Sequence, residues 1–160
     1  MKDFNIIPEI VKNIQYMNNH AVEVGVMGGG EIQMIAAVNE YGARIKVTEK
    51  SRKALHGMGL HLKKTTDYIT IPERSFFRST LSDDSTMSKA IDRISPALIG
   101  QIDGRTALDL MGASVKGAIQ NKIKSNIKPA NHPFTVKKKR SRKTLANKGQ
   151  LSGSIDYQVV

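Results

Sequence analysis

The stretch that decides the fold is Ile69-Thr-Ile-Pro-Glu-Arg-Ser-Phe-Phe-Arg78, which we call the corner. Its two isoleucines alternate with Thr70, a period-two pattern that predicts a half-buried strand. Pro72 then ends strand pairing, because proline has no N–H to donate. A helix is expected to begin within a few residues, with Pro72 in its first turn or Ser75 as its N-cap. The corner is therefore predicted to turn the chain from a strand into a helix.

Four side chains of the corner are candidate anchors or contacts. Phe76 and Phe77 are half of the four phenylalanines in the chain and are predicted to be core anchors. Arg74 and Arg78 lie four residues apart and would share one face of a helix. They are candidates for binding an anion or a neighbouring subunit. The alternative for both is a salt bridge within the chain.

Periodicities elsewhere predict one α+β domain over residues 1–160, with a small, mainly antiparallel sheet packed against helices. Strands are expected at 21–27, 44–47, 66–71 and 155–159. Helices are expected at about 5–18, 31–41, 86–102 and 105–126, and from the corner to Leu81. Pro96 should kink or divide the helix over 86–102. Gly112 and Gly117 either weaken the long helix or allow a close approach.

The first helix carries one apolar stripe. Its members recur at spacings of three and four residues, and they are Ile6, Ile7, Ile10, Val11 and Ile14. Asn18-Asn19 is the expected end of this helix. In the next helix, the apolar residues Ile32, Ile35, Ala36 and Val38 are expected to pack inward, and Gly42 is expected to end it.

The net charge of +11 comes from two segments. Residues 44–64 contain seven Lys or Arg and one acid, and residues 136–148 contain seven more and no acid. The rest of the chain has eleven basic and thirteen acidic residues, so the body is close to neutral. We predict that 44–65 is an extended basic loop or hairpin. We predict that 127–150 is an extended basic arm between the long helix and the last strand.

The two basic segments supply most of the candidate subunit contacts. With Arg74 and Arg78, the candidates are Arg44, Lys46, Arg52, Lys53, Lys137, Lys138, Lys139, Arg140, Arg142 and Lys143. No aromatic residue lies among the cations of 137–143, so base stacking is not indicated. Contact with nucleic-acid phosphates, docking to an acidic protein surface and a solvated loop are the three interpretations of this run.

No catalytic, cofactor or metal site is predicted, and the chain is not expected to be an enzyme. The absence of cysteine excludes disulfides and thiolate metal sites. His56 and His61 lie in one loop without acidic ligands at metal spacing. Asp83-Asp84 is interpreted as a helix cap rather than a cation site. Gly25–Gly30 lacks the pattern of a phosphate-binding loop.

The first residues of the chain and the length of its apolar runs predict no membrane contact. The first residues lack the apolar core of a signal peptide. No apolar run reaches the length that a bilayer requires.

Four motifs occur in an order that resembles a known family. They are Val22-Glu-Val-Gly-Val-Met27 with Ile35-Ala-Ala-Val-Asn-Glu-Tyr-Gly42; Ile71-Pro-Glu-Arg-Ser-Phe-Phe-Arg78; the long helix with Ala107-Leu108, Met111-Gly112, Ile119 and Ile123; and an ending with Leu145, Gly149-Gln-Leu151, Ser154-Ile155, Tyr157 and Val159. In this order the chain resembles the bacteriophage tail-completion and neck proteins, which are virion-morphogenesis proteins of the head–tail junction. Ser75 stands where that family often has a second proline.

The resemblance implies a structural virion protein without catalysis or cofactor. Such proteins form homo-oligomeric rings, usually with sixfold symmetry, through heterologous contacts. The implied partners are further copies of the chain in a hexameric ring, neighbouring neck, tail-terminator or tail-tube proteins, and genomic DNA through non-specific contacts. The implied location is the tail or neck of the virion, after assembly in the bacterial host cytoplasm. The competing hypothesis is a basic DNA-binding accessory protein without sequence specificity.

Overall fold

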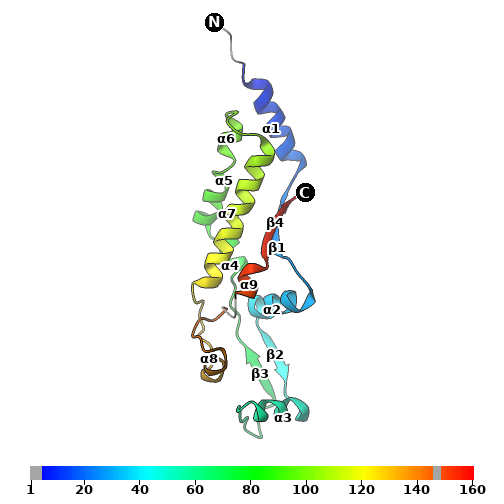
Figure 1. Cartoon of the computed structure of the whole chain (residues 1–160), viewed down its shortest axis with the longest axis vertical. Helices are drawn as coiled ribbons and strands as arrows, with labels where there is room; N and C mark the ends of the chain where they lie inside the picture. Colours follow the sequence, from blue (N-terminus) through cyan, green and yellow to red (C-terminus); the bar gives the residue numbers. More distant parts are fainter. Residues whose placement is uncertain (1–4, 146–148) are drawn as a thin grey trace.

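The computed structural model describes residues 5–145 and 149–160, and it shows an elongated α+β molecule (Figure 1). In chain order the elements are α1 (Ile7–Asn19), β1 (Val22–Val26), α2 (Gly30–Tyr41), β2 (Ala43–Lys46), α3 (Glu49–Gly57), β3 (Tyr68–Ile71), α4 (Arg78–Leu81), α5 (Asp84–Ile91), α6 (Ser95–Leu98), α7 (Gly104–Lys124), α8 (Pro133–Lys139), α9 (Gln150–Gly153) and β4 (Ile155–Val159). The predicted fold class is confirmed. The strands form two separate antiparallel pairs, β1–β4 and β2–β3, rather than one sheet.

The long helix α7 and the β1–β4 pair form the centre of the molecule. Asp103 caps α7, because its carboxylate accepts the N–H of Thr106 at 2.9 Å. In β4, Ile155 pairs with Val26 and Val159 with Val22, so the last strand rejoins the first as predicted. Both strands lie along α7 (Figure 1). The first and last strands of the chain are therefore brought together on one helix.

The core lies where this centre meets the corner. Phe76 is 1% exposed and Ile119 and Ile155 are fully buried, in one cluster with Leu151. Phe77 is partly buried and packs against the same cluster. Phe76 is thus a core anchor, and Phe77 supports it from the edge.

The helices after the corner follow the sequence pattern. Pro96 divides the helix expected over 86–102 into α5 and α6, and it occupies the first turn of α6, where its missing N–H is tolerated. Asp83 caps α5, because its carboxylate accepts the N–H of Thr86 at 2.9 Å. The carboxyl pair Asp83-Asp84 thus begins a helix.

The helix α1 is held to the body by a polar side chain. Asn13 is 2% exposed, and its Nδ2 donates to the carbonyl oxygens of Ala97 and Ile102, both at 2.9 Å. Its Oδ1 accepts the N–H of Gly104 at 3.0 Å. The predicted apolar stripe faces solvent instead: exposed fractions are 65% for Ile7, 45% for Val11 and 39% for Ile14.

The segment 44–65, predicted as an extended loop or hairpin, carries most of β2 and the whole of helix α3, and β3 follows it to complete a two-stranded hairpin. In β2 and β3, Ala43 pairs with Ile71 and Lys46 with Tyr68. Helix α3 begins with a capping box, in which Thr48 Oγ1 accepts the N–H of Ser51 and Ser51 Oγ accepts the N–H of Thr48. This local capping stabilises a helix that has little apolar periodicity.

The segment 127–150 is also less extended than predicted. Residues Pro133–Lys139 form α8, which starts with proline in its first turn. Thr144 and Leu145 are buried, and Leu145 belongs to the core cluster, so the arm is anchored near its C-terminal end. Residues 146–148 of the segment lie outside the described residues.

Two glycines of α7 form a matched pair for a stability test. A Cβ on Gly112 would lie 2.3 Å from Cδ2 of Tyr157, whereas a Cβ on Gly117 would meet nothing within 4 Å. Gly112→Ala is expected to lower the free energy of unfolding by about 1–3 kcal/mol through overpacking against β4. Gly117→Ala is expected to raise it by up to about 1 kcal/mol through helix propensity. Urea unfolding of both variants measures this, and equal effects would contradict the close approach.

Candidate functional site

A buried carboxylate from α2 organises the corner. Glu40 is 5% exposed and lies in the last turn of α2. Its Oε2 accepts the N–H groups of Phe76 at 2.8 Å and Phe77 at 2.9 Å. Its Oε1 accepts the N–H of Arg78 at 3.0 Å and the hydroxyl of Ser75 at 2.7 Å. The first N–H groups of a helix have no partner within it, so Glu40 caps the start of α4 from another helix.

The helix starts later than expected. The sequence predicts a start at Pro72 or Ser75, but α4 begins at Arg78. The N–H groups of Phe76, Phe77 and Arg78 all donate to Glu40, so this carboxylate supplies the acceptors that the first N–H groups of the turn lack. The hydroxyl of Ser75 donates to Glu40 and accepts the N–H of Ser79 at 3.3 Å, so it assists the same turn.

Gly42 brings the carboxylate and the corner together. Its φ is +72°, in the region that favours glycine, and its ψ of 171° turns the chain out of α2 directly into β2. A Cβ there would lie 3.0 Å from the N of Glu73 and 3.0 Å from the O of Ile71. The N–H of Arg74 donates to the carbonyl of Asn39 at 2.7 Å. The end of α2 is therefore fixed against the corner by backbone as well as by Glu40.

Hydrogen bonds determine the ionisation of Glu40. Burial alone would raise the pKa of its carboxyl. The N–H groups of Phe77 and Arg78, the hydroxyl of Ser75 and the guanidinium of Arg78 outweigh burial, and the pKa is lowered from its ordinary value. Glu40 is thus held as a carboxylate inside the fold.

Arg78 pairs with acids of its own chain. Its Nε lies 3.1 Å from Oε1 of Glu40, and its Nη2 lies 2.6 Å from Oε1 of Glu73. The guanidinium also lies over the ring of Tyr41, 4.6 Å from its centroid. The hydrogen bond to Glu40 is the main reason that the pKa of Arg78 is raised. The intramolecular alternative therefore holds for Arg78, and a role between subunits stays a prediction.

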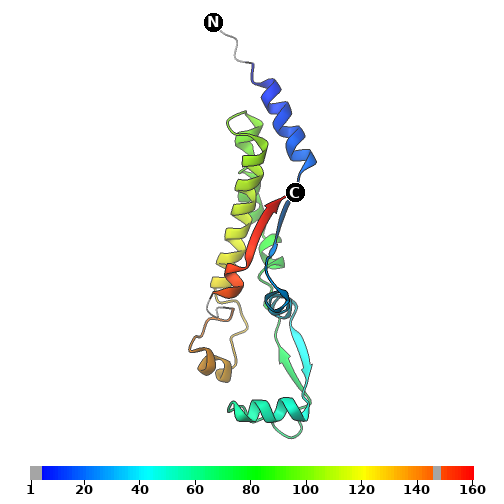
Figure 2. The same cartoon turned by 45° about the vertical axis from the view of Figure 1, so that its right-hand side comes forward.

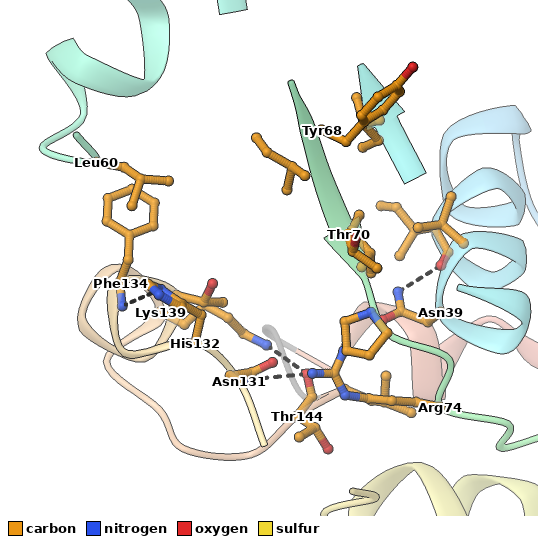
Figure 3. A pocket seen from close by; sticks show the side chains of 18 of the residues that line it. Asn39, Leu60, Tyr68, Thr70, Arg74, Asn131, His132, Phe134, Lys139 and Thr144 are labelled. Atoms are coloured by element: carbon orange, nitrogen blue, oxygen red, sulfur yellow. Dashed lines mark hydrogen bonds between the residues drawn. The ribbon is translucent and has the colours of Figure 1, made fainter. Parts of the chain in front are cut away.

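A groove of about 760 Å³ lies between α2, the β2–β3 hairpin and the segment around α8 (Figure 3). Its walls are mainly apolar and include Met34, Ile35, Ile45, Leu60, Ile69 and Phe134. Ile35 was expected to pack inward, but it is 36% exposed on this groove. The groove brings together the two basic segments that the sequence keeps 60 residues or more apart. Figure 2 shows α8 on one side of this end of the molecule, the hairpin on the other and α3 across the tip.

Arg74 and Lys139 lie at the inner end of the groove, which we define by Arg74, Lys139 and Thr144. Arg74 is 5% exposed; its Nε donates to the carbonyl of Pro129 at 2.8 Å and its Nη2 to that of Ala130 at 3.3 Å. Nζ of Lys139 donates to the carbonyl of Thr144 at 3.1 Å. Among the described residues, no carboxylate pairs with either cation.

Burial acts on both cations at the inner end. It lowers the pKa of Arg74. It is also the main reason that the pKa of Lys139 is lowered, and the charge of Arg74 lowers it further. Two like charges therefore share a poorly solvated site, which favours a bound anion.

The remaining candidate cations are spread over the same end of the molecule. Arg52 is used within its segment, because its guanidinium donates to the carbonyls of Leu62, Lys63 and Thr66. The guanidinium of Arg44 lies 4.0 Å from the centroid of Tyr68. The others with exposed side chains are Lys46, Lys53, Lys137, Lys138, Arg140, Arg142 and Lys143. These residues form a basic surface around the groove rather than one compact site.

The histidines of the α3 segment lie close together without forming a metal site in the described part of the chain. The rings of His56 and His61 meet edge to face with centroids 4.4 Å apart. Within residues 5–145 and 149–160, no three His, Asp or Glu side chains gather as a metal site requires. None of the helices in the described part of the chain has the length and apolar character needed to cross a bilayer.

Comparisons of the chain with models of protein families, with curated proteins and with solved structures found no match. The resemblance to tail-completion and neck proteins therefore stays a prediction. The site itself must carry any proposal about function.

Sequence reasoning missed Glu40. The residue belongs to the quoted motif Ile35–Gly42, and it is the one acid near the end of a predicted helix. That position is unfavourable for a carboxylate with respect to the helix dipole. This misplaced charge is the signal that could have indicated a partner elsewhere in the chain.

Glu40→Gln is expected to lower the free energy of unfolding near neutral pH by about 2–4 kcal/mol, because the amide nitrogen cannot accept N–H groups. The folded-state pKa of Glu40 is lowered, so the ionised carboxylate stabilises the fold fully above the unfolded-state pKa of about 4.3. This stabilisation is lost as the pH falls through the folded-state pKa. Urea unfolding at neutral and acidic pH should show the two proteins converging in acid.

Glu73→Gln is the matched control, because Glu73 pairs with the same guanidinium at the surface. It should cost less than about 1 kcal/mol. Equal losses in the two variants, or a difference independent of pH, would contradict the capping role of Glu40.

Proposed function

We propose that the chain is a structural subunit of a tailed bacteriophage virion, of the tail-completion or neck type, and forms a homo-oligomeric ring. The observation that carries this proposal is a pair of uncovered apolar surfaces far apart on the molecule. One is the stripe of Ile7, Val11 and Ile14 on α1, and the other is the groove beside α8 (Figure 1). A ring uses heterologous contacts, in which two different surfaces of each subunit meet neighbours.

The α1 stripe has the properties of a contact surface. A helix on the surface of a monomer normally turns its apolar stripe to the core. In α1 the side chain that is buried is Asn13, whose hydrogen bonds hold the helix and leave the stripe outside. Three large apolar side chains spaced by four and three residues are typical of a helix that docks on a partner.

The basic surface supports a second role in the same assembly. The exposed cations of α8 and the following residues carry no salt bridge among the described residues. They are available to acidic surfaces of neighbouring proteins or to phosphates. Both are present where DNA passes through a ring of the head–tail junction, which supports the proposed location.

Mass measurement of the full chain in solution tests the ring. The wild type should give one discrete oligomer, with six subunits as the expected number. Val11→Asp should give a monomer that still unfolds cooperatively, because it places a charge in the stripe without touching the core. Lys12→Asp is the control, because Lys12 is exposed on the polar side of α1 away from the stripe, and it should keep the oligomer. A wild type that stays monomeric at every concentration would overturn the proposal.

The competing function is non-specific DNA binding, favoured by the cluster of exposed cations around α8. It predicts a monomer or dimer that shifts duplex DNA with micromolar or tighter affinity. That affinity should fall by about 10³-fold or more between about 50 mM and about 200 mM salt if the cluster makes six or more phosphate contacts. Electrophoretic shifts at both salt concentrations, beside the mass measurement, separate the two functions. A ring with weak duplex affinity supports the structural role.

A further inference from the structure

The inner end of the groove combines two cations and a hydroxyl group with apolar walls. Arg74 has five N–H groups, and its described hydrogen bonds use Nε and one N–H of Nη2. Thr144 is 4% exposed, and its Oγ1 has no hydrogen-bond partner among the described residues. A buried hydroxyl without a hydrogen-bond partner is destabilising, so its presence at the inner end points to a ligand.

We propose that this end of the groove binds a carboxylate carried by an apolar segment of a neighbouring protein, with Arg74, Lys139 and the Thr144 hydroxyl as its ligands. The argument is charge complementarity. Two cations that no carboxylate of the described chain neutralises lie beneath walls that suit leucine-like side chains. A guanidinium, an ammonium and a hydroxyl are all donors to a carboxylate.

The geometry favours a protein segment over nucleic acid. Arg74 is almost fully buried and lines the groove, whereas a duplex presents its phosphates on a wide, rigid surface. The wall residues Met34, Ile35, Ile45 and Leu60 offer no hydrogen bonds to sugars or base edges. A narrow chain with apolar side chains and one acid can reach the inner end and cover the walls at the same time.

The walls of the groove come from separate parts of the chain. Its α8 side joins its hairpin side through Nζ of Lys138, which lies 2.8 Å from Sδ of Met58. In Figure 3, Phe134 and Leu60 face each other at the outer end, and Arg74 lies near Thr144 at the inner end. The bound segment is therefore oriented with its carboxylate at the cationic inner end and its apolar side chains toward the outer end.

A matched pair of peptides tests the site on the full chain. The probe is acetylated trileucine with a free carboxylate, and its control is the same peptide as the amide. Calorimetry should show at least about tenfold tighter binding of the carboxylate form, as expected for charged hydrogen bonds. The Nε–H nuclear magnetic resonance signal of Arg74 should shift with the carboxylate form only. Equal affinities, or no binding of either peptide, would overturn the proposal.

Three variants locate the binding. Lys139→Met should remove most of the preference for the carboxylate, and Lys137→Met, an equal loss of charge on the exposed side of α8, should leave it unchanged. Thr144→Val should weaken the binding of the carboxylate form several-fold without lowering the stability of the free protein, because within residues 5–145 and 149–160 the hydroxyl has no hydrogen bond to lose. A preference that survives Lys139→Met and Thr144→Val would place the peptide elsewhere and overturn the proposal.

Two further arms identify the source of the anion. Octanoate that binds while the peptide does not would mean a fatty-acid site, and duplex DNA that displaces the peptide would mean a phosphate site. Either result would overturn the assignment to a protein segment. That the neighbour belongs to the ring rests on the proposed function: an intact ring with no peptide binding refutes only the site, and a peptide-binding monomer refutes only the ring.

Discussion

The Glu40 carboxylate is the interaction on which the rest of the structure depends. It joins the end of α2 to the start of α4 by accepting three backbone N–H groups and two side-chain donors. The strands β2 and β3 lie between these two helices, so the same carboxylate closes the base of the hairpin. The hairpin forms one wall of the groove, and α2 forms another. A shift of this cap would therefore move the core anchor Phe76 and both walls together.

The two buried charges of the corner are balanced in different ways. Glu40 is surrounded by N–H groups and by Arg78, so its charge is fully used inside the fold. Among the described residues, the hydrogen bonds of Arg74 go to carbonyl oxygens, which stabilise a cation through dipoles but leave its net charge. Lys139 adds a second positive charge beside it. The charge of Glu40 is thus neutralised within the chain, whereas the charges of Arg74 and Lys139 suit an external anion.

Elements with local signals were predictable from the sequence. The alternation of Val22, Val24 and Val26 predicts β1, and the apolar period from Ala107 to Ile123 predicts α7. In both elements, the buried face is visible in the local spacing of apolar residues. Helices α3 and α8 were missed because charged residues fill them and few apolar positions repeat. Their signals were caps instead: Thr48 with Ser51, and Pro133 in a first turn. In both helices, the residues at the start indicate a helix although the apolar periodicity does not.

The site was less predictable, because its contacts join residues far apart in the sequence. The pattern placed Arg74 and Arg78 on one helix face, but α4 begins only at Arg78, so the two guanidinium groups point to different partners. Pairings of Glu40 with Phe76, or of Asn13 with Gly104, follow from tertiary packing that no local period encodes.

The placement of polar and apolar groups leaves two unlike surfaces of the chain uncovered. The apolar stripe of α1 is exposed while Asn13 anchors the helix, and the groove ends in two cations that no carboxylate of the described residues pairs; both depart from the usual rule that apolar faces are covered and buried charges are paired. The proposed ring would cover both surfaces. Because the two surfaces differ in chemistry, each is suited to a different neighbour contact. A subunit with two unlike contact surfaces is suited to ring assembly, whereas a two-fold dimer would need one self-complementary surface.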